Sequence, residues 1–256
     1  MEINGASAII TGGASGIGEA AARRLSALGA RCVIADLNEA KGKELASALG
    51  GEFAKVDVTN TEEVQAAVDA AMALAPLRVL VNSAGIGFIG RTVNREGQPF
   101  DLDAFERVLR INLTGSFNCL RLAAASMAKT DPVDADGQRG VIVNMASAAA
   151  YDGQTGQAAY AASKGGIVSM TLPIARDLSA IGVRVNTIAP GLIDTPIYGE
   201  GEGSEKFKAN LAQNVQFPKR LGYAEEIASM IVELVTNDYM NAEVVRVDGG
   251  VRLPPK

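Results

Sequence analysis

The sequence predicts an α/β fold, a doubly wound parallel sheet in a single domain with helices on both faces. Short apolar runs rich in β-branched residues recur along the 256 residues, and longer stretches with helix signals separate them. Uninterrupted apolar runs suit strands that are covered on both faces, and a strand-helix alternation builds a parallel sheet through right-handed crossovers. With 48% hydrophobic residues, the chain can bury a full core without metals or disulfides.

The elements follow one another in a regular order. Apolar runs predict strands at 6–11, 31–36, 53–57, 78–82, 140–145, 183–188 and 243–247. Ala-rich periodic stretches predict helices at 17–28, 39–48 and 61–74, and N-terminal cap signals stand at Asn60 with Glu63 and at Asp103 with Glu106. Two stretches interrupt the alternation. They are the polar insertion 130–140 and the Gly-rich segment 191–222, whose part from 192 to 222 is long enough to be a lid over a site.

The charge balance and the absence of histidine exclude several classes of function. Asp and Glu (29) outnumber Lys and Arg (24), and neither sign forms a long block, which argues against a nucleic-acid partner. Without histidine there is no Ser-His-Asp triad, no Cys-His pair and no His-ligated zinc, and we expect no metal. Acid-base chemistry must therefore use Tyr, Lys, Asp, Glu or Cys.

Cysteine usage and the first residues predict an intracellular protein. Cys32 and Cys119 lie far apart in apolar runs, as expected of buried thiols in a reducing compartment. The segment Met1-Glu2-Ile3-Asn4 has no charged n-region, and no apolar run approaches the roughly 18 residues of a membrane span. We expect a cytoplasmic protein without a membrane partner, and the mitochondrial matrix stays open as an alternative.

A glycine-rich turn follows the first strand directly. It reads Thr11-Gly12-Gly13-Ala14-Ser15-Gly16-Ile17-Gly18, and an Ala-rich helix begins there. Glycine lets the backbone turn tightly and approach a pyrophosphate, whose charge the free N–H groups and dipole of the helix N-terminus can hold. The spacing differs from G-x-G-x-x-G, and a merely flexible turn is the alternative interpretation. The strand-turn-helix context favours a dinucleotide site.

Asp36 closes the second strand, 18 residues after Gly18. A carboxylate there can accept hydrogen bonds from the ribose hydroxyls of adenosine, and it would repel a 2′-phosphate. Ser15 and Leu37, where a basic residue could restore phosphate binding, are uncharged. The sequence therefore favours NAD over NADP, although Asp36 could also be an ordinary acidic residue before a helix.

Ser147, Tyr160 and Lys164 form a possible catalytic group. Tyr160 and Lys164 stand four apart in a helical stretch and share a face, and Ser147 follows the strand 140–145, at the edge where such sheets bind ligands. Lowering the pKa of a tyrosine from about 10 to near neutrality takes about 4 kcal/mol. One cation about 4 Å away supplies roughly that much at an effective dielectric near 20. A Tyr-x-x-x-Lys pair alone is common on helices. The interpretation as a catalytic group therefore depends on the glycine-rich turn and on Ser147 after the strand 140–145.

Taken jointly, these motifs resemble the short-chain dehydrogenase/reductase family over essentially the whole chain. The matching segments are Thr11-Gly12-x-x-x-Gly16-x-Gly18, Asp57-Val58, Asn82-Ser83-Ala84-Gly85, Asn112, Ser147, Tyr160-x-x-x-Lys164 and Pro190-Gly191 with Thr195. The resemblance implies a Rossmann-like fold with a seven-stranded sheet, a homotetramer and a nicotinamide dinucleotide.

The resemblance also implies a role for each matching residue. Tyr160 would be the acid/base, Ser147 would bind the substrate oxygen, Lys164 would hold the nicotinamide ribose and lower the pKa of Tyr160, and Asn112 would anchor a water relay. The implied cofactor contacts are Gly12, Ser15, Gly16, Ile17, Gly18, Asp36, Leu37, Asp57, Val58, Asn82, Ala84, Gly85, Tyr160, Lys164, Pro190, Gly191, Ile193 and Thr195.

A narrower resemblance covers chiefly residues 100–225. In this part the chain is similar to the type 2 3-hydroxyacyl-CoA dehydrogenases, also called 17β-hydroxysteroid dehydrogenases of type 10. The segments that carry the likeness are the insertion 130–140, Gln138 to Asn144, Gly153 to Tyr160, Leu172 to Leu178, Ala189-Pro190-Gly191 and Phe217-Pro218-x-Arg220-Leu221-Gly222. It implies an acyl-CoA substrate of fatty acid metabolism, contacted by Ser147, Gln157, Tyr160, Leu192 and Ile197, with the lid residues Ile193, Phe207 and Leu211 against the acyl chain. The acidic, Gly-rich stretch from Tyr198 to Gly203 departs from this likeness.

Other functions stay open from the sequence. The substrate could be a steroid, a sugar or a 3-oxoacyl group on a carrier protein, although reductases of the last kind commonly use NADP. A dinucleotide-sensing protein without turnover could share the fold. A protein of that kind would be expected to lose Ser147, Tyr160 or Lys164, and all three are present.

Overall fold

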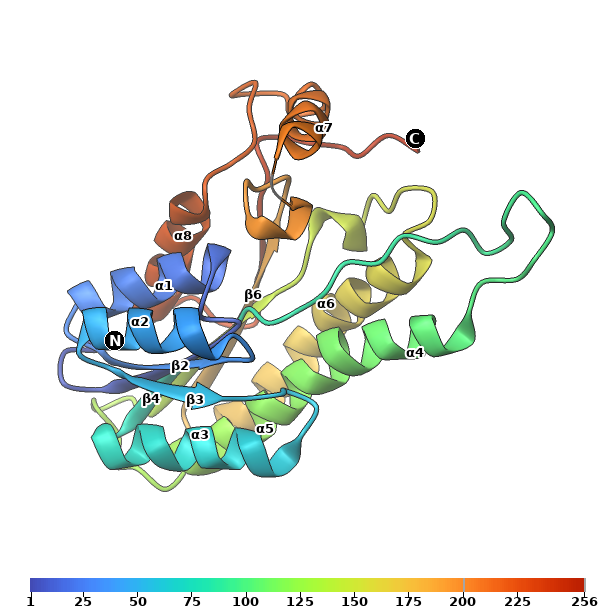
Figure 1. Cartoon of the computed structure of the whole chain (residues 1–256). Helices are drawn as coiled ribbons and strands as arrows, with labels where there is room; N and C mark the ends of the chain where they lie inside the picture. Colours follow the sequence, from blue (N-terminus) through green and yellow to red (C-terminus); the bar gives the residue numbers. More distant parts are fainter. Residues whose placement is uncertain (200, 256) are drawn as a thin grey trace.

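The protein is built around one seven-stranded parallel sheet (Figure 1). The computed structural model describes residues 1–199 and 201–255, without the side chains of Ile197 and Glu202. The strand order is β3-β2-β1-β4-β5-β6-β7, and every neighbouring pair is parallel. The strands are β1 (Ser7–Thr11), β2 (Arg31–Asp36), β3 (Glu52–Lys55), β4 (Leu77–Asn82), β5 (Gly140–Met145), β6 (Val183–Pro190) and β7 (Val244–Val247). The order reverses between β1 and β4, which is where such sheets open a crevice for ligands.

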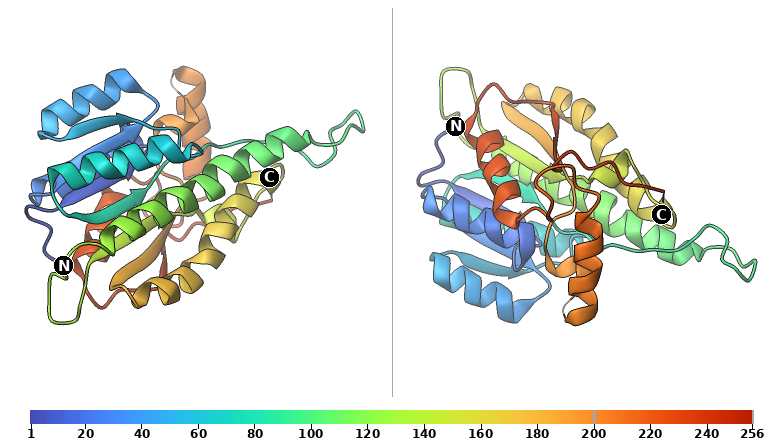
Figure 2. Two further views of the ribbon diagram at one scale, coloured as in Figure 1. Left: turned by 90° about the horizontal axis from the view of Figure 1, so that it is seen from below. Right: turned by 90° about the horizontal axis from the view of Figure 1, so that it is seen from above.

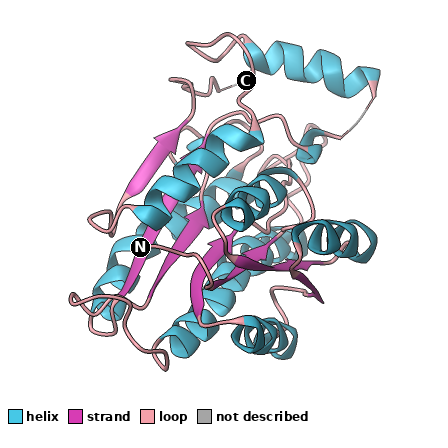
Figure 3. Ribbon diagram, turned by 90° about the vertical axis from the view of Figure 1, so that its left-hand side faces the viewer, coloured by secondary structure: helices cyan, strands magenta, loops and turns pink. Residues whose placement is uncertain are grey.

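Helices cover both faces of the sheet, as the apolar strands predict (Figure 3). One face packs against α1 (Gly16–Ala27), α2 (Glu39–Leu49) and α8 (Ala224–Thr236). The other packs against α3 (Thr61–Leu74), α5 (Ser116–Met127) and α6 (Ala158–Ser179). Neighbouring residues of β1 point to opposite faces, so Ile10 joins the first core and Ile9 the second.

Five further elements and one long arm complete the fold. The helix α4 (Leu102–Leu109) continues through the π-helical segment η1 (Arg110–Gly115) into α5. Short helical turns η2 (Ala148–Ala150) and η3 (Pro196–Tyr198) follow β5 and β6, and α7 (Glu202–Ala212) lies in the segment expected to be a lid. The arm, residues 86–101 between β4 and α4, projects from the body of the molecule (Figure 1).

The structure adjusts two of the predicted boundaries. Strand β3 ends at Lys55, so Asp57 lies in the turn after it rather than within it. Asn60 caps α3 as predicted, because its side chain accepts from the N–H groups of Glu62 and Glu63. The cap of α4 is Asp101 rather than Asp103, whose N–H donates to the Asp101 carboxylate.

The insertion 130–140 lies at the end of the sheet away from the predicted site. The Arg78 guanidinium, at the start of β4, donates to the Thr130 hydroxyl at 2.6 Å and to the Asp131 carbonyl at 2.7 Å. The Gln138 amide donates to Asp238 at 3.0 Å. Figure 2 shows this loop beside the N-terminus, remote from the arm. The insertion therefore supports the family resemblance as sequence likeness and not by contact with a substrate, because ligands of such sheets bind at the opposite edge.

Candidate active site

The glycine turn after β1 packs against the turn after β4. Gly12 has φ +62°, and a Cβ there would lie 2.8 Å from the Ala84 backbone. The Thr11 hydroxyl accepts from the N–H groups of Ser83 (3.1 Å) and Ala84 (3.2 Å). A Cβ on Gly18 would come within 2.2 Å of the Gly12 carbonyl oxygen. Glycine at 12 and 18 thus lets two carboxyl-end turns and the start of α1 come together.

The first turn of α1 faces the turn that follows β6. Ser15 is the N-cap but its hydroxyl makes no capping bond, and Gly16 has φ +53°. A Cβ on Gly16 would lie 3.3 Å from Thr195 Cγ2, so Thr195 reaches the glycine turn as predicted. The helix N-terminus, including Ile17, leaves backbone N–H donors and a positive dipole end at this edge, which fit a pyrophosphate.

Asp36 lies beside the glycine turn. Its carboxylate accepts from the Ala14 N–H at 3.0 Å and from the Asn38 N–H at 2.8 Å. Leu37 is exposed. Lys55 stands opposite Asp36 in the neighbouring strand, but its ammonium lies 4.0 Å from Glu39. The position of the Asp36 carboxylate fits an adenosine ribose. Its negative charge would repel a 2′-phosphate at the same place.

The Asp57-Val58 turn lies next to Asp36 at the same edge of the sheet. The Asp57 carboxylate accepts from the N–H and hydroxyl of Thr59, at 2.9 and 2.8 Å. Val58 is buried, and its carbonyl accepts from Asn118 of α5 at 2.9 Å. These bonds fix the turn where an adenine ring would meet the protein.

Asn82 braces the sheet instead of facing a ligand. Its side-chain amide donates to the Ser116 carbonyl at 3.0 Å and to Asn144 Oδ1 at 2.9 Å, and the residue is only 2% exposed. The side chain of Asn82 is therefore used within the protein, and a cofactor contact of this residue through its backbone stays a prediction. The exposed Gly85 and the half-buried Ala84 are what this turn offers to a ligand.

Ser147, Tyr160 and Lys164 meet at the carboxyl end of β5. Ser147 opens η2, while Tyr160 and Lys164 lie one turn apart on α6. Lys164 is buried, its ammonium donates to the Met145 carbonyl at 2.8 Å, and it lies 5.8 Å from the centre of the Tyr160 ring. The helix thus places a phenol and a cation together beside a serine hydroxyl.

Burial dominates the protonation of this group. It raises the pKa of Tyr160, and the neighbouring Ser147 hydroxyl offsets part of that rise. Burial lowers the pKa of Lys164 to about 8. That Lys164 lowers the pKa of Tyr160 stays a prediction, because burial is the largest influence on the phenol in this structure. The ammonium is directed to the Met145 carbonyl instead of the phenol, so removal from water is the larger effect.

Asn112 joins this group from the π-helical segment. A Cβ on Gly85 would lie 3.2 Å from Asn112 Oδ1 and 3.6 Å from Lys164 Nζ. Asn112 Oδ1 accepts from the Ile86 N–H at 2.8 Å, and its amide donates to the Ile86 carbonyl (3.0 Å) and the Ser163 hydroxyl (3.1 Å). Asn112 therefore positions the β4 turn against α6. A π-helical turn is common at functional sites, and the sequence pattern did not reveal this one.

The turn after β6 is fixed to the last strand and to the lid segment. The Gly191 N–H donates to the Val247 carbonyl at 3.0 Å, and a Cβ on Gly191 would lie 2.7 Å from Asp248. Ile193 pairs with Gly222 and is 6% exposed, so its side chain belongs to the core. The contacts predicted for Ile193 with the cofactor and the acyl chain stay a prediction, which its burial limits to the backbone as the structure stands.

The other residues predicted on this side keep surfaces toward the crevice or fall outside it. Pro190 ends β6 and is buried, whereas Leu192 is half-buried. The side chain of Ile197 lies outside the described residues. Phe207 is exposed on α7 and stacks edge-on against Tyr198, with ring centres 6.0 Å apart. The sequence did not single out Tyr198 as a neighbour of the site, although burial raises its pKa to about 12 and Tyr160 adds to that rise.

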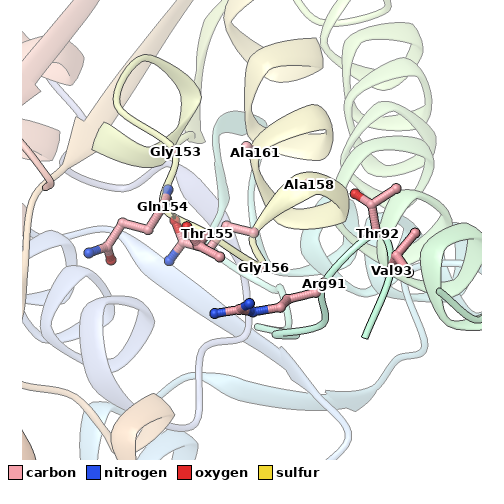
Figure 4. A pocket seen from close by; sticks show the side chains of 10 residues that line it. Arg91, Thr92, Val93, Gly153, Gln154, Thr155, Gly156, Ala158 and Ala161 are labelled. Carbon is pink, nitrogen blue, oxygen red and sulfur yellow. Dashed lines mark hydrogen bonds between the residues drawn. The ribbon is translucent and has the colours of Figure 1, made fainter. Parts of the chain in front are cut away.

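A cavity of about 460 Å³ lies beside the N-terminus of α6 (Figure 4). Residues 153–158 and Ala161 line one side, and Arg91, Thr92 and Val93 of the arm line the other. Gln157 lines this cavity, and its side-chain oxygen Oε1 accepts from the Gln154 N–H at 3.0 Å. That it contacts the substrate stays a prediction. The arm's contribution was missed, although its irregular run of Phe, Ile and Val beside an arginine could have been noticed.

The described residues form neither a metal site nor a membrane span. Among the described residues, no three His, Cys, Asp or Glu side chains gather into a possible metal site. Within residues 1–199 and 201–255, each helix is too short or too polar to cross a bilayer.

Comparisons with known proteins agree with this arrangement. Residues 6–205 match the family model described as short chain dehydrogenase. The chain is 49% identical to 3-hydroxyacyl-CoA dehydrogenase type-2 of Homo sapiens, over 99% of this chain and 97% of the human one. It is 46% identical to the protein of that name from Drosophila melanogaster, over 99% of this chain and 100% of that one.

A solved structure is similar over almost the same range. The crystal structure of 3-hydroxyacyl-CoA dehydrogenase type-2 from Mycobacterium avium has a TM-score of 0.94 and 48% identity, with 98% of each chain covered.

Proposed function

The chain belongs to the short-chain dehydrogenase family, and from that premise we propose that it is an NAD-dependent dehydrogenase whose substrate is a 3-hydroxyacyl-CoA. The observation that carries the proposal is the meeting of Ser147, Tyr160 and Lys164 at the edge of the sheet beside the glycine turn. Bound NAD would supply the hydride acceptor, which the protein itself lacks. The residues that would hold it are those of the glycine turn, Asp36, the β4 turn and the β6 turn.

The three side chains divide the remaining chemistry. The Ser147 hydroxyl binds the oxygen of the substrate alcohol. Tyr160, as the phenolate, takes the proton of the substrate's hydroxyl group as the substrate carbon gives up hydride, which leaves a ketone. In reduction the same phenol returns the proton. Lys164, whose pKa burial lowers to about 8, is mostly charged at neutral pH and steadies the phenolate. Asn112 keeps the β4 turn and α6 in register around them.

Three observations support an acyl-CoA over a small alcohol. The relatives at 46–49% identity carry the name 3-hydroxyacyl-CoA dehydrogenase type-2. The cavity beside α6 gives room for a substrate that extends past the reacting carbon, and Arg91 gives that room a positive charge suited to phosphates. Leu192, Phe207 and Leu211 give the segment 192–222 apolar surface, and we assign this segment as the lid over the acyl chain.

Kinetics with matched substrates tests the proposal. We expect 3-hydroxybutyryl-CoA or a longer homologue to be oxidised with kcat/KM at least about a hundredfold above the free 3-hydroxy acid, because binding energy from the remote CoA portion can be used at the reacting carbon. A carrier-protein thioester, a steroid and a sugar alcohol are the controls. If any of these controls is oxidised as efficiently as every acyl-CoA, the assignment of an acyl-CoA substrate is wrong, although the protein would still be a dehydrogenase. No reduction of NAD with any alcohol would contradict the enzyme itself.

A further inference from the structure

The loop between Ser147 and Tyr160 has little structure of its own. After η2 it runs through residues 151–157, and Gly156 adopts φ +89°. On the arm side, one bond holds it, from the Gly90 N–H to the Gly156 carbonyl at 2.9 Å. This loop lines the cavity and carries Gln157, so its position decides the shape of the substrate side of the site.

Arg246 holds the other side of this loop. Its guanidinium donates to Asp152 at 2.8 Å and lies 5.2 Å from the centre of the Tyr151 ring. It also donates to Asp248 at 2.7 Å and to the Val251 carbonyl at 3.0 Å. The side chains of Arg246 and Asp152 are each 23% exposed, so water screens this ion pair less than a surface pair.

The segment after β7 adds two hydrogen bonds to the same loop. The Gln154 side-chain amide donates to the Pro254 carbonyl at 3.1 Å, and the Thr155 N–H donates to the Pro255 carbonyl at 3.0 Å. Asp248, which accepts from Arg246, packs against the turn after β6, because a Cβ on Gly191 would lie 2.7 Å from Asp248. Arg246 is thus at the point where the last strand, the β6 turn and the substrate loop join.

We propose that Arg246, through its ion pair with Asp152, is the positioning residue that fixes the substrate loop. Arg246 lies on β7 and holds the start of the loop at Asp152, whereas the bonds from Gly90 and to Pro254 and Pro255 hold residues 154–156. The inference rests on the proposed function only in taking this loop as the substrate side. Arg246 also contacts Asp248 beside the β6 turn, so its loss removes more than the ion pair. Asp152 contributes only the ion pair and lies away from the turns that would hold the dinucleotide, so its loss should affect substrate binding and not dinucleotide binding.

Steady-state kinetics of Arg246→Gln and Asp152→Asn tests this role. We expect each to raise KM for the alcohol substrate about tenfold with a smaller change in kcat, while the Kd of NADH for Asp152→Asn, followed by its fluorescence, stays within twofold. The double variant should be no worse than the worse single variant, since both remove one pair. Arg252→Gln is the control, because Arg252 touches Asp248 but is 64% exposed and does not contact Asp152.

A purely structural role would give a different result. It would lower the amount of folded enzyme, and so the apparent kcat, without moving KM. An unchanged KM in both single variants, additive effects in the double variant, or an equal weakening of NADH binding by Asp152→Asn would overturn the inference.

Hydrogen-deuterium exchange tests the same inference without turnover, and so separates it from the proposed function. In Arg246→Gln, amides in residues 153–157 should exchange at least about tenfold faster, while those of α1 keep their wild-type rates. Unchanged exchange in the loop would overturn the positioning role even if the enzyme oxidises acyl-CoA. If exchange changes as expected and no alcohol is oxidised, the positioning role stands and the proposed function fails.

Discussion

Replacing Tyr160 with Phe removes the phenolic hydroxyl and leaves the ring that packs near Lys164. We expect kcat to fall by about 10²–10⁴, because the transferable proton is lost, while the fold and NADH affinity are kept. Stopped-flow or steady-state assays measure kcat, and the midpoint of thermal unfolding shows whether the fold is kept. A variant that retains more than about a tenth of the wild-type kcat would show that another group moves the proton.

Asp36 supports a second prediction at this scale. Its carboxylate lies beside the glycine turn, where we expect the adenosine ribose, and Leu37 next to it carries no charge. We expect NAD to exceed NADP in kcat/KM by at least about tenfold, which corresponds to about 1.4 kcal/mol. Asp36→Ala combined with Leu37→Arg should narrow or reverse the ratio. Equal use of both cofactors by the natural protein would mean that Asp36 does not face the ribose.

Residue types at fixed spacings were predictable where the chemistry itself fixes them. Gly12 and Gly18 must lack side chains because backbone passes where a Cβ would be, and Tyr160 and Lys164 share a face because a helix turns every 3.6 residues. The directions of the Asn82 and Ile193 side chains were not predictable. They depend on Asn144 and Gly222, partners far away in the chain.

The segment from η3 to α7 is held to the β6 turn by an ion pair. Lys208 of α7 lies 2.8 Å from Asp194 and 3.1 Å from Glu205, which raise its pKa. Lys208→Met should raise KM for substrate by up to about fivefold, since a partly exposed pair is worth at most about 1 kcal/mol. Lys206→Met on the same helix is the control. A KM unchanged by Lys208→Met would mean that this pair does not hold the lid.

Strands and the first three helices follow from hydrophobic periodicity, and the structure confirms them. The π-helical segment was not predicted, because the one-residue offset that it introduces between α4 and α5 is small against the irregularity of an apolar pattern over so few turns. The insertion 130–140 was recognised, but its place was not, because the side of the sheet it occupies follows from Arg78 and Asp238 and not from its own composition. The cavity was missed since two loops far apart in sequence form it.

The seven-stranded sheet leaves β3 and β7 as its edges, and Phe117 of α5 is 45% exposed. Exposed edges and aromatic side chains are surfaces that assembly can cover. In line with the family resemblance, we expect a homotetramer with four times the 26.5 kDa of one chain. Light scattering at several protein concentrations measures this mass. A single species of one-chain mass at all concentrations would contradict the expectation.

The pairing of α1 with α8 also has a consequence for synthesis on the ribosome. The two helices pack on one face of the sheet, where Leu25 of the first shares a core with Ile231 of the second. Nearly two hundred residues separate the two helices. At a translation rate of roughly 5–20 residues per second, α8 is synthesised on the order of ten seconds or more after α1. During that interval the nascent chain exposes an apolar surface of α1 that a chaperone can bind.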